Sequence, residues 1–584
     1  MIRSPIRLDG RRQDPHAGPA PVGLADRGME IAAHDLWQTV RGGKHVLRGV
    51  SLTVRARELV AVVGGSGAGK TTLLEALAGV RPADRGNVRF DGVDLYANLD
   101  AFRRRFGYVP QDDIIHADLP LERTLRYAAA LRLPRSTPAA EVDAAVEGAL
   151  AALDLSSRAG VRVGALSGGQ RKRASIAVEL LTSPHVFFLD EPTSGLDPAS
   201  SGELLRLLRG VADAGSTVVF TTHSVQDLAR CDRVVFLARD GYLAFVGTVP
   251  EALDYFAVER VEEIYERLAW ESTPEQWAER FEGHRGNGAA ASIAIAPARP
   301  QSGDGIGFAR EWAVLTRRTL ETLVRNRLTM AILLGSPALI VAMFAVLFRP
   351  GAFAFASPSP SAITMILFWV TFAAFFFGLT YGLLQIVTER AILRREQLVG
   401  QRLSAYLLSK TAVLLPFLLF VVVLMLVVLR ALDRLPAGST TTYLEIGVTL
   451  ALLAAGALTL GLLTSAAVSN PAQATLALPM LCFPAVLFSG AILPVHVMAG
   501  AGAAISTVIP DRWAFEALGH DLGVRHILAD GGSPLGPPLL EAYGADAGTQ
   551  ATAAYWLYLA AFAVVFFFGA WAILRRRSRS GRRS

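Results

Sequence analysis

The chain has 584 residues, of which 52% are hydrophobic and 18% charged, and its formal net charge is +6. This length exceeds one ordinary hydrophobic core, so at least two domains are expected. The basic surplus does not indicate nucleic-acid binding, because the arginines form no single stripe and many stand at the ends of apolar runs. The cysteines Cys231 and Cys482 lie far apart and predict neither a disulfide framework nor a metal cluster.

The chain begins with a Pro-, Arg- and Gly-rich stretch, residues 1–28, which lacks the apolar segment of a signal peptide and predicts a disordered leader. Further on, the apolar run Leu59–Val63 predicts a buried strand that leads into a glycine-rich turn and a helix beginning near Thr72. The turn has the P-loop pattern Gly64-Gly65-Ser66-Gly67-Ala68-Gly69-Lys70-Thr71.

The P-loop pattern predicts a nucleotide site. In such a turn the backbone N–H groups and the helix dipole face the phosphates, Lys70 neutralises phosphate oxygens, and the Thr71 hydroxyl binds Mg²⁺. We therefore expect residues from Gly64 to Thr72 to bind ATP together with Mg²⁺.

A second buried strand, Val186–Leu189, ends in Asp190 and Glu191. Carboxylates at this place can hold Mg²⁺ and can orient or deprotonate the water that attacks a γ-phosphate. Taken alone, the pair would more often be the solvated start of a loop, but its position after the P-loop favours catalysis. We assign Asp190 to the metal and Glu191 to the water.

The order of motifs resembles the nucleotide-binding domain of ATP-binding cassette (ABC) transporters. After the P-loop come Gln111 in Gly107-Tyr108-Val109-Pro110-Gln111, the signature Leu166-Ser167-Gly168-Gly169-Gln170, Asp190-Glu191, Ser194-Gly195-Leu196-Asp197, and His223 in Thr221-Thr222-His223-Ser224.

The resemblance implies a role for each of these residues. Gln111 resembles the Q-loop glutamine, which contacts Mg²⁺ and the attacking water and relays to the membrane domain. Asp197 resembles the D-loop aspartate, and His223 resembles the switch histidine on the γ-phosphate. By itself His223 would more often be a structural histidine, so its role rests on the ordered set.

The signature residues Ser167, Gly168 and Gly169 open a predicted helix that continues through Ala174–Leu181, and a helix N-terminus suits an anion. In the family this motif, with Gln170, closes on ATP held by a second cassette. Because the chain carries one cassette, the resemblance implies a head-to-tail pair of chains with two shared ATP sites. Without the resemblance, the segment would be an ordinary glycine-containing helix start.

Trp37 stands where the family places an aromatic side chain on the adenine, usually a tyrosine. The alternative is a tryptophan of the protein core. These residues lie in the predicted cassette, 29–256. A helical extension and linker, 257–307, follows, with helical charge patterning from 257 to 271 and a Gly-, Ala-, Pro- and Ser-rich composition from 283.

Residues 308–326 predict an amphipathic connecting helix on the membrane surface, with a soluble helix packed on the cassette as the alternative. Beyond it, residues 327–574 predict a membrane domain, because six apolar runs approach the roughly 20 residues that a spanning helix needs. They lie near 328–348, 362–387, 411–429, 446–468, 472–493 and 553–574.

Basic residues crowd the segment between the second and third runs and the tail 575–584, whereas the long segment 495–552 has only Arg512 and Arg525. This bias predicts a multi-pass protein of the plasma (inner) membrane, with the cassette and both termini in the cytoplasm. The loop from Glu389 to Arg402 is then the candidate coupling helix that meets the cassette near Gln111.

A cassette followed by six spans resembles the ABCG subfamily and its bacterial relatives with ABC-2 type membrane domains. Three features support the closer resemblance: Gln170-Arg171-Lys172-Arg173, Glu389-Arg390, and Phe488-Ser489-Gly490. The segment 495–552 has no cysteine, which suits the bacterial branch better than eukaryotic members that have disulfides there.

The expected fold is thus an α/β P-loop NTPase cassette followed by an all-α six-span domain. Few ionisable residues interrupt the spans, which disfavours a proton or small-ion carrier. The aromatic residues Phe368 to Phe377 either line an apolar substrate cavity or pack between helices and lipid. We expect an ATP-driven half-size exporter of an amphipathic, lipid-like or drug-like molecule, working with a second copy or a similar chain. The alternative is an ATP-driven signalling or mechanical device that transports nothing.

Overall fold

The computed structural model describes residues 28–40, 42–103, 105–134, 136–285, 306–544 and 548–580. These residues form two compact units, one ending at Ile306 and the other beginning at Gly307. Residues 1–27 of the predicted leader, residues 286–305 of the predicted linker and residues 581–584 of the tail lie outside the described residues.

The first unit contains two sheets. Its strands are β1 (Ile31–Thr39), β2 (His45–Val54), β3 (Leu59–Gly64), β4 (Arg85–Phe90), β5 (Val93–Asp94), β6 (Phe106–Val109), β7 (Val186–Leu189), β8 (Thr217–Thr221), β9 (Arg233–Leu237) and β10 (Leu243–Gly247). A four-stranded antiparallel sheet has the order β2-β1-β4-β5, and a six-stranded sheet has the order β10-β9-β3-β8-β7-β6.

The larger sheet brings distant motifs to one edge. β3, β8, β7 and β6 are parallel neighbours, so their carboxyl ends lie on the same side. The P-loop follows β3, His223 follows β8, Asp190 follows β7 and Gln111 follows β6. Strands β3 and β7 are buried along their whole length, which confirms the two strands predicted from apolar runs.

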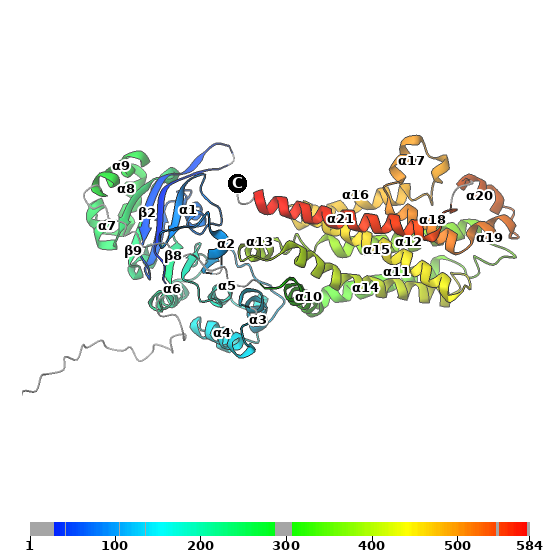
Figure 1. Cartoon of the computed structure of the whole chain (residues 1–584), viewed down its shortest axis with the longest axis horizontal. Helices are drawn as coiled ribbons and strands as arrows, with labels where there is room; N and C mark the ends of the chain where they lie inside the picture. The colour runs from blue at the N-terminus through cyan, green and yellow to red at the C-terminus, as the bar shows by residue number, and fades with distance from the viewer. Residues whose placement is uncertain are drawn as a thin grey trace, which may run out of the picture. The chain divides into compact units, whose positions relative to one another are not determined.

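Helices cover this unit, as Figure 1 shows. They are α1 (Lys70–Leu77), α2 (Leu99–Phe102), α3 (Leu121–Arg132), α4 (Ala139–Ala152), α5 (Gly168–Leu180), α6 (Pro198–Asp213), α7 (Val249–Phe256), α8 (Val261–Trp270) and α9 (Pro274–Arg285), with short 3-10 turns at Ser156–Arg158, Val163–Ala165, Val225–Arg230 and Arg239–Gly241. The extension after the last strand is held by aromatic packing, since Trp277 is fully buried and its ring lies 5.1 Å from that of Phe256.

The second unit is helical. It contains α10 (Phe308–Arg325), α11 (Arg327–Leu347), α12 (Pro360–Leu383), α13 (Arg390–Leu398), α14 (Leu403–Ala431), α15 (Thr440–Ala467), α16 (Pro471–Phe488), α17 (Gly500–Ser506), α18 (Pro510–Asp521), α19 (Val524–Asp530), α20 (Gly536–Tyr543) and α21 (Thr552–Ser580), with a 3-10 turn at Val495–Val497. Among the described residues, six helices are long and apolar enough to cross a membrane: α11, α12, α14, α15, α16 and α21. They coincide with the six predicted runs.

Several span boundaries differ from those expected by a few residues, and two of the differences have a clear structural cause. The third helix begins at Leu403 rather than near 411, so it includes Lys410, whose amino group is buried 2.7 Å from the carboxylate of Glu389. This pairing lets the helix continue through a charged residue. The fifth helix ends at Phe488 rather than near 493, because Gly490 adopts a left-handed conformation with φ 83°.

The connecting helix α10 belongs to the second unit and packs on α14. Its buried side carries charge: Arg318 donates two hydrogen bonds to Glu396 of α13, one of them at 2.9 Å, and Glu311 accepts one from the backbone N–H of Arg402 at 2.7 Å. Apolar side chains such as Trp312 and Leu320 are exposed instead. An exposed apolar face is the arrangement that a helix on a membrane surface requires.

The segment 495–552 does not consist only of loop. Helix α18 packs against the spanning helices α12, α15 and α21. This packing buries Asp511 completely, and burial raises the pKa of its carboxyl group well above the usual range. The sequence prediction concerned the interiors of the six apolar runs, so it did not cover Asp511 on α18, and it left Lys410 outside a spanning helix that in fact begins at Leu403.

The aromatic side chains of α12 were predicted either to line a substrate cavity or to pack between helices and lipid, and their exposed fractions decide this for some of them. Phe368, Phe375 and Phe377 are each only 2% exposed and pack into the core of the helical unit. Trp369 on the same helix is 40% exposed. Three of these aromatic side chains therefore serve helix packing.

Candidate functional site

The P-loop is shaped by the sheet beneath it. Gly69 precedes helix α1 with φ 93°, and a Cβ atom there would approach the carbonyl oxygen of Val46 to 2.5 Å. A side chain is thus excluded both by conformation and by space. The first helical residue, Lys70, is 8% exposed, and its amino group donates to the carbonyl oxygens of Gly64 at 3.0 Å and Gly65 at 3.1 Å. Burial lowers the pKa of Lys70, while the charges of Glu191 and Asp190 oppose that shift.

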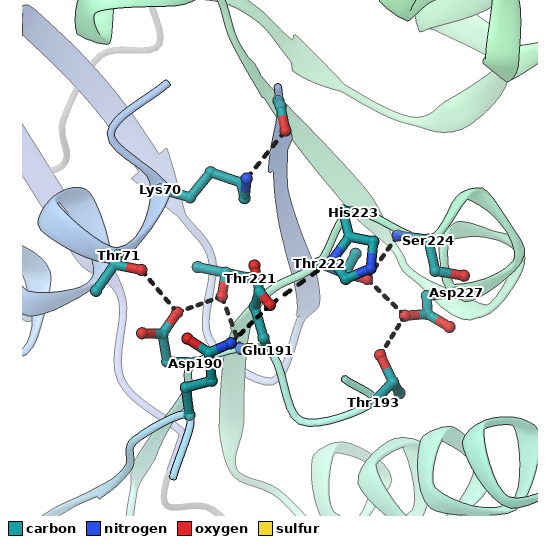
Figure 2. A network of polar contacts seen from close by, with 12 residues as sticks. Lys70, Thr71, Asp190, Glu191, Thr193, Thr221, Thr222, His223, Ser224 and Asp227 are labelled. Carbon is teal, nitrogen blue, oxygen red and sulfur yellow. Dashed lines mark hydrogen bonds and ion pairs between the residues drawn. The ribbon is translucent and has the colours of Figure 1, made fainter. Parts of the chain in front are cut away.

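A chain of hydrogen bonds joins the P-loop to the two carboxylates (Figure 2). The Thr71 hydroxyl donates to Oδ1 of Asp190 at 3.1 Å, and the Thr221 hydroxyl donates to the same oxygen at 2.6 Å. Thr221 also accepts from the backbone N–H of Glu191 at 2.8 Å. Thr221, at the end of β8, therefore fixes both the side chain of Asp190 and the backbone of Glu191.

Glu191 is held in a left-handed backbone conformation with φ 42°, which is costly for a residue with a side chain. Its Oε2 accepts a hydrogen bond from the amide of Gln111 at 3.2 Å and lies 3.7 Å from Nδ1 of His223. His223 is 64% exposed, so its ring is open to a ligand. The structure thus brings together Gln111, Glu191 and His223, which lie on three different loops.

A second layer of buried hydrogen bonds supports the His223 loop. The carboxylate of Asp227, 2% exposed, accepts from the Thr222 hydroxyl at 2.6 Å and from the Thr193 hydroxyl at 2.8 Å. Thr222 also accepts from the backbone N–H of Ser224 at 3.0 Å. These contacts, drawn in Figure 2, tie the loop after β8 to the segment that follows Glu191.

The signature turn forms the N-terminus of α5. The Ser167 hydroxyl accepts from the backbone N–H of Gln170 at 3.3 Å, and the Gln170 side chain accepts from the backbone N–H of Ser167 at 3.2 Å, which completes a capping box. A Cβ atom at Gly168 would meet no heavy atom within 4 Å in the described part of the protomer. None of the hydrogen bonds among the described residues joins this turn to the P-loop.

Asp197 lies beside the signature turn and caps helix α6. Its carboxylate accepts from the backbone N–H groups of Ala199 and Ser200, both at 3.0 Å, and from the Ser200 hydroxyl at 2.7 Å. The bonds from Ser200 lower the pKa of Asp197. Its neighbour Leu196 lies 3.6 Å from the Cβ position of Gly169.

Trp37 is partly exposed on β1 rather than buried in the core. Its indole N–H donates to Asp35 at 2.7 Å, and its ring meets His45 edge-on at 5.8 Å. This position disfavours the core alternative, and stacking on adenine stays a prediction.

Sequence reasoning did not assign roles to Thr221, Thr222, Thr193 and Asp227. Thr221 and Thr222 stand directly before His223 in its motif. Two neighbouring hydroxyl groups at the end of a buried strand could have indicated that they hold the site in place. Asp227 carried no such signal, because its partner Thr193 is 34 residues away in sequence.

Models of two known protein families match this chain. A family model described as ABC transporter matches residues 47–194, and one described as ABC-2 type transporter matches residues 310–520. The fold and the matched site define a P-loop ATPase domain of the ABC type joined to a helical membrane domain. The match to the cassette model implies an ATP-binding domain with ATPase activity.

The relatives narrow the family. The chain is 34% identical over 486 residues to the ABC transporter ATP-binding/permease protein Rv1747 of Mycobacterium tuberculosis, covering 82% of this chain and 56% of that protein. It is 39% identical over 229 residues to ABC transporter G family member 26 of Arabidopsis thaliana (38% and 33%), and 37% identical over 220 residues to ABC transporter G family member 5 of Oryza sativa subsp. japonica (36% and 28%). The chain carries an ABC cassette and an ABC-2 type membrane domain, is homologous to ABCG family members and fits an ABCG-like half-transporter. It spans about half of the bacterial relative and about a third of the plant relatives.

Proposed function

We propose that this chain is an ATP-driven half-size exporter that works as a dimer and moves an amphipathic, lipid-like or drug-like molecule out across the plasma membrane. The observation that carries the dimer is the signature turn, whose Gly168 faces open space in its own protomer. In ABC cassettes, which this chain resembles, the signature turn of one chain closes on the ATP of a second cassette, and two-fold symmetry makes that contact reciprocal.

Two ATP molecules would then be bound at shared sites. Residues Gly64 to Thr72 hold the phosphates of one nucleotide, and Ser167, Gly168, Gly169 and Gln170 of the partner cover it, with Asp197 beside them and Trp37 at the adenine. Thr71 and Asp190 fit Mg²⁺, since a hydroxyl and a carboxylate oxygen lie 3.1 Å apart and both are hard oxygen ligands. Gln111 completes this set. Bound Mg²⁺ would neutralise phosphate charge.

Glu191 acts on the attacking water. Its carboxylate is held by Gln111 and faces His223, which we assign to the γ-phosphate. The rigid backbone around Glu191, fixed by Thr221, keeps this base in place without rearrangement. In this scheme, ATP hydrolysis returns the ATP-bound closed dimer to its open state.

The membrane path is proposed from the helical unit. Its spans are mostly apolar, which suits an amphipathic substrate better than an ion. The basic segment around α13 and the basic tail 575–584 support a topology in which the cassette and both termini are cytoplasmic. Within this topology α13 serves as the coupling helix.

Reconstitution tests the proposal. The purified chain in liposomes, with the cassette outside, is given ATP and either a fluorescent short-chain phospholipid or a lipophilic dye. We expect ATP-dependent movement of at least one probe that is lost in Glu191→Gln. ATP hydrolysis without movement of any probe would instead support the signalling or mechanical alternative.

A further inference from the structure

Lys172 is a buried cation that the roles assigned so far do not use. It lies on helix α5, five residues beyond Ser167, and is only 4% exposed. Its amino group donates to the backbone carbonyl oxygens of Gln111 at 2.6 Å and of Pro110 at 3.5 Å. Burial lowers the pKa of Lys172, and the charge of Asp113 opposes the shift. A buried ammonium group needs such partners, so the contact fixes the main chain of the Gln111 loop.

The contact continues into the catalytic centre. The backbone of Gln111 is held by Lys172, and its side-chain amide donates to Glu191 at 3.2 Å. Helix α5 is thus linked to the predicted general base through two hydrogen bonds and one residue. Strand β6 ends at Val109, so only Pro110 separates the strand from the Gln111 carbonyl that Lys172 holds.

Helix α5 is itself firmly anchored. Glu179 on α5 forms a bidentate pair with Arg132 of α3, with N–O distances of 2.7 and 2.9 Å, and both side chains are almost fully buried. Arg132 also donates to the carbonyl oxygen of Val178 at 3.1 Å. These contacts tie the far end of α5 to α3, so we expect the two helices to move as one unit when the signature end of α5 moves.

We propose that Lys172 is a positioning residue that makes the location of Gln111, and through it the hydrogen bond to Glu191, follow the signature helix. The inference rests on the proposed shared sites. Ser167 at the start of α5 meets the partner's nucleotide, while Gln111 serves the protomer's own nucleotide. Lys172 thereby couples the two ATP sites of the dimer.

Steady-state kinetics on the full-length chain in lipid nanodiscs test the positioning role. Lys172→Met removes the donor but keeps the length of the side chain. We expect kcat to fall roughly tenfold or more, because a misplaced catalytic group costs that much, while the affinity for fluorescently labelled ATP stays within about twofold. Lys172→Arg, which can donate to both carbonyls, should recover much of kcat.

Arg173→Met is the matched control. Arg173 is the next residue of α5, its side chain is 14% exposed, and it donates to the carbonyl oxygen of Leu153 at 3.4 Å, away from Gln111. We expect this variant to keep its kcat. An unchanged kcat in Lys172→Met, or an equal loss in Arg173→Met, would overturn the proposal. If the methionine variant does not fold, Lys172→Leu, whose shorter side chain also lacks a donor, provides the same comparison.

Hydrogen exchange separates coupling from general stability. In a Glu191→Gln background, we expect MgATP to protect the amides of residues 166–171 and of residues 111–116. Adding Lys172→Met should leave protection at 166–171 and remove it at 111–116. Protection retained in both segments, or lost in both, contradicts the coupling role. Absence of protection at 166–171 in Glu191→Gln alone would contradict the shared sites, and the kinetic comparison would still judge Lys172.

Discussion

The two glycine-rich turns of the cassette differ in what surrounds them. At the P-loop, a Cβ atom on Gly69 would collide with the Val46 carbonyl, and Lys70 is buried against Gly64 and Gly65. At the signature turn, a Cβ atom on Gly168 would meet nothing within 4 Å in the described protomer. Folding of one chain therefore explains Gly69 but not Gly168, although Gly65 and Gly67 of the first turn also leave room for a Cβ atom. The second turn is therefore where a function between chains is expected.

The largest effect should come from the base beside the first turn. Glu191→Gln removes the carboxylate that we assign to the attacking water, and loss of general-base catalysis costs about 10²- to 10⁴-fold in rate. We expect ATP binding to survive, because the P-loop contacts are unchanged. Phosphate release and binding of labelled ATP measure the two properties separately. A normal rate of ATP hydrolysis in this variant would show that Glu191 is not the residue that acts on the attacking water.

The next effect concerns the second turn. Gly168→Leu adds bulk where the protomer has room, so the thermal unfolding temperature should stay near that of the wild type. Turnover should fall at least about tenfold, since the side chain would enter the partner's nucleotide site. Calorimetry and ATPase assays check the two parts. A large loss of stability would show that folding alone requires this glycine.

The first turn should behave in the opposite way. Gly69→Ala places a side chain at φ 93° and against Val46, which we expect to cost about 1–3 kcal/mol of folding free energy. Denaturant unfolding of the nucleotide-free protein measures this cost. Stability equal to that of the wild type would erase the contrast between the two turns.

Thr221 tests how firmly the first turn's carboxylates are held. Thr221→Val leaves Glu191 N–H without its acceptor and removes a donor from Asp190, at a cost of about 1–3 kcal/mol in stability. Turnover should fall with it, whereas Thr221→Ser, which keeps the hydroxyl, should retain both. Equal stability and equal turnover in the valine and serine variants would show that the Thr221 hydroxyl has no such role.

The smallest effect is expected at Asp197, beside the second turn. The lowered pKa of this carboxyl means that its contribution as a helix cap is present above the usual aspartate pKa and is lost as pH falls through the lowered value. Asp197→Ala should slightly lower the unfolding temperature at neutral pH, and the difference from the wild type should shrink in acid. A difference that is constant over this range would contradict the capping role.

Local patterns in the sequence predicted much of this molecule. Strands β3 and β7, the P-loop and the six spanning helices are each written in contiguous residues, and the structure contains them. The hydrogen bonds of Thr221 and Asp227 were not predictable, because they depend on which strands become neighbours. Lys410 was placed outside its helix for a similar reason, since its partner Glu389 precedes the helix.

The site showed the same division. The types of residue at the proposed catalytic centre followed from motif order, but their contacts did not. The bond between Gln111 and Glu191 joins residues 80 positions apart, and Lys172 reaches the Gln111 loop across 61 positions. Such contacts arise only once the parallel sheet has assembled.

Paired variants test the shared sites most directly. Two differently tagged chains are co-purified so that a dimer carries Lys70→Met on one chain and Gly168→Leu on the other, or both substitutions on one chain beside a wild-type partner. Shared sites predict ATPase activity in the first dimer, which keeps one intact pair of turns, and none in the second. Activity in the second dimer and none in the first would show that each chain hydrolyses ATP alone.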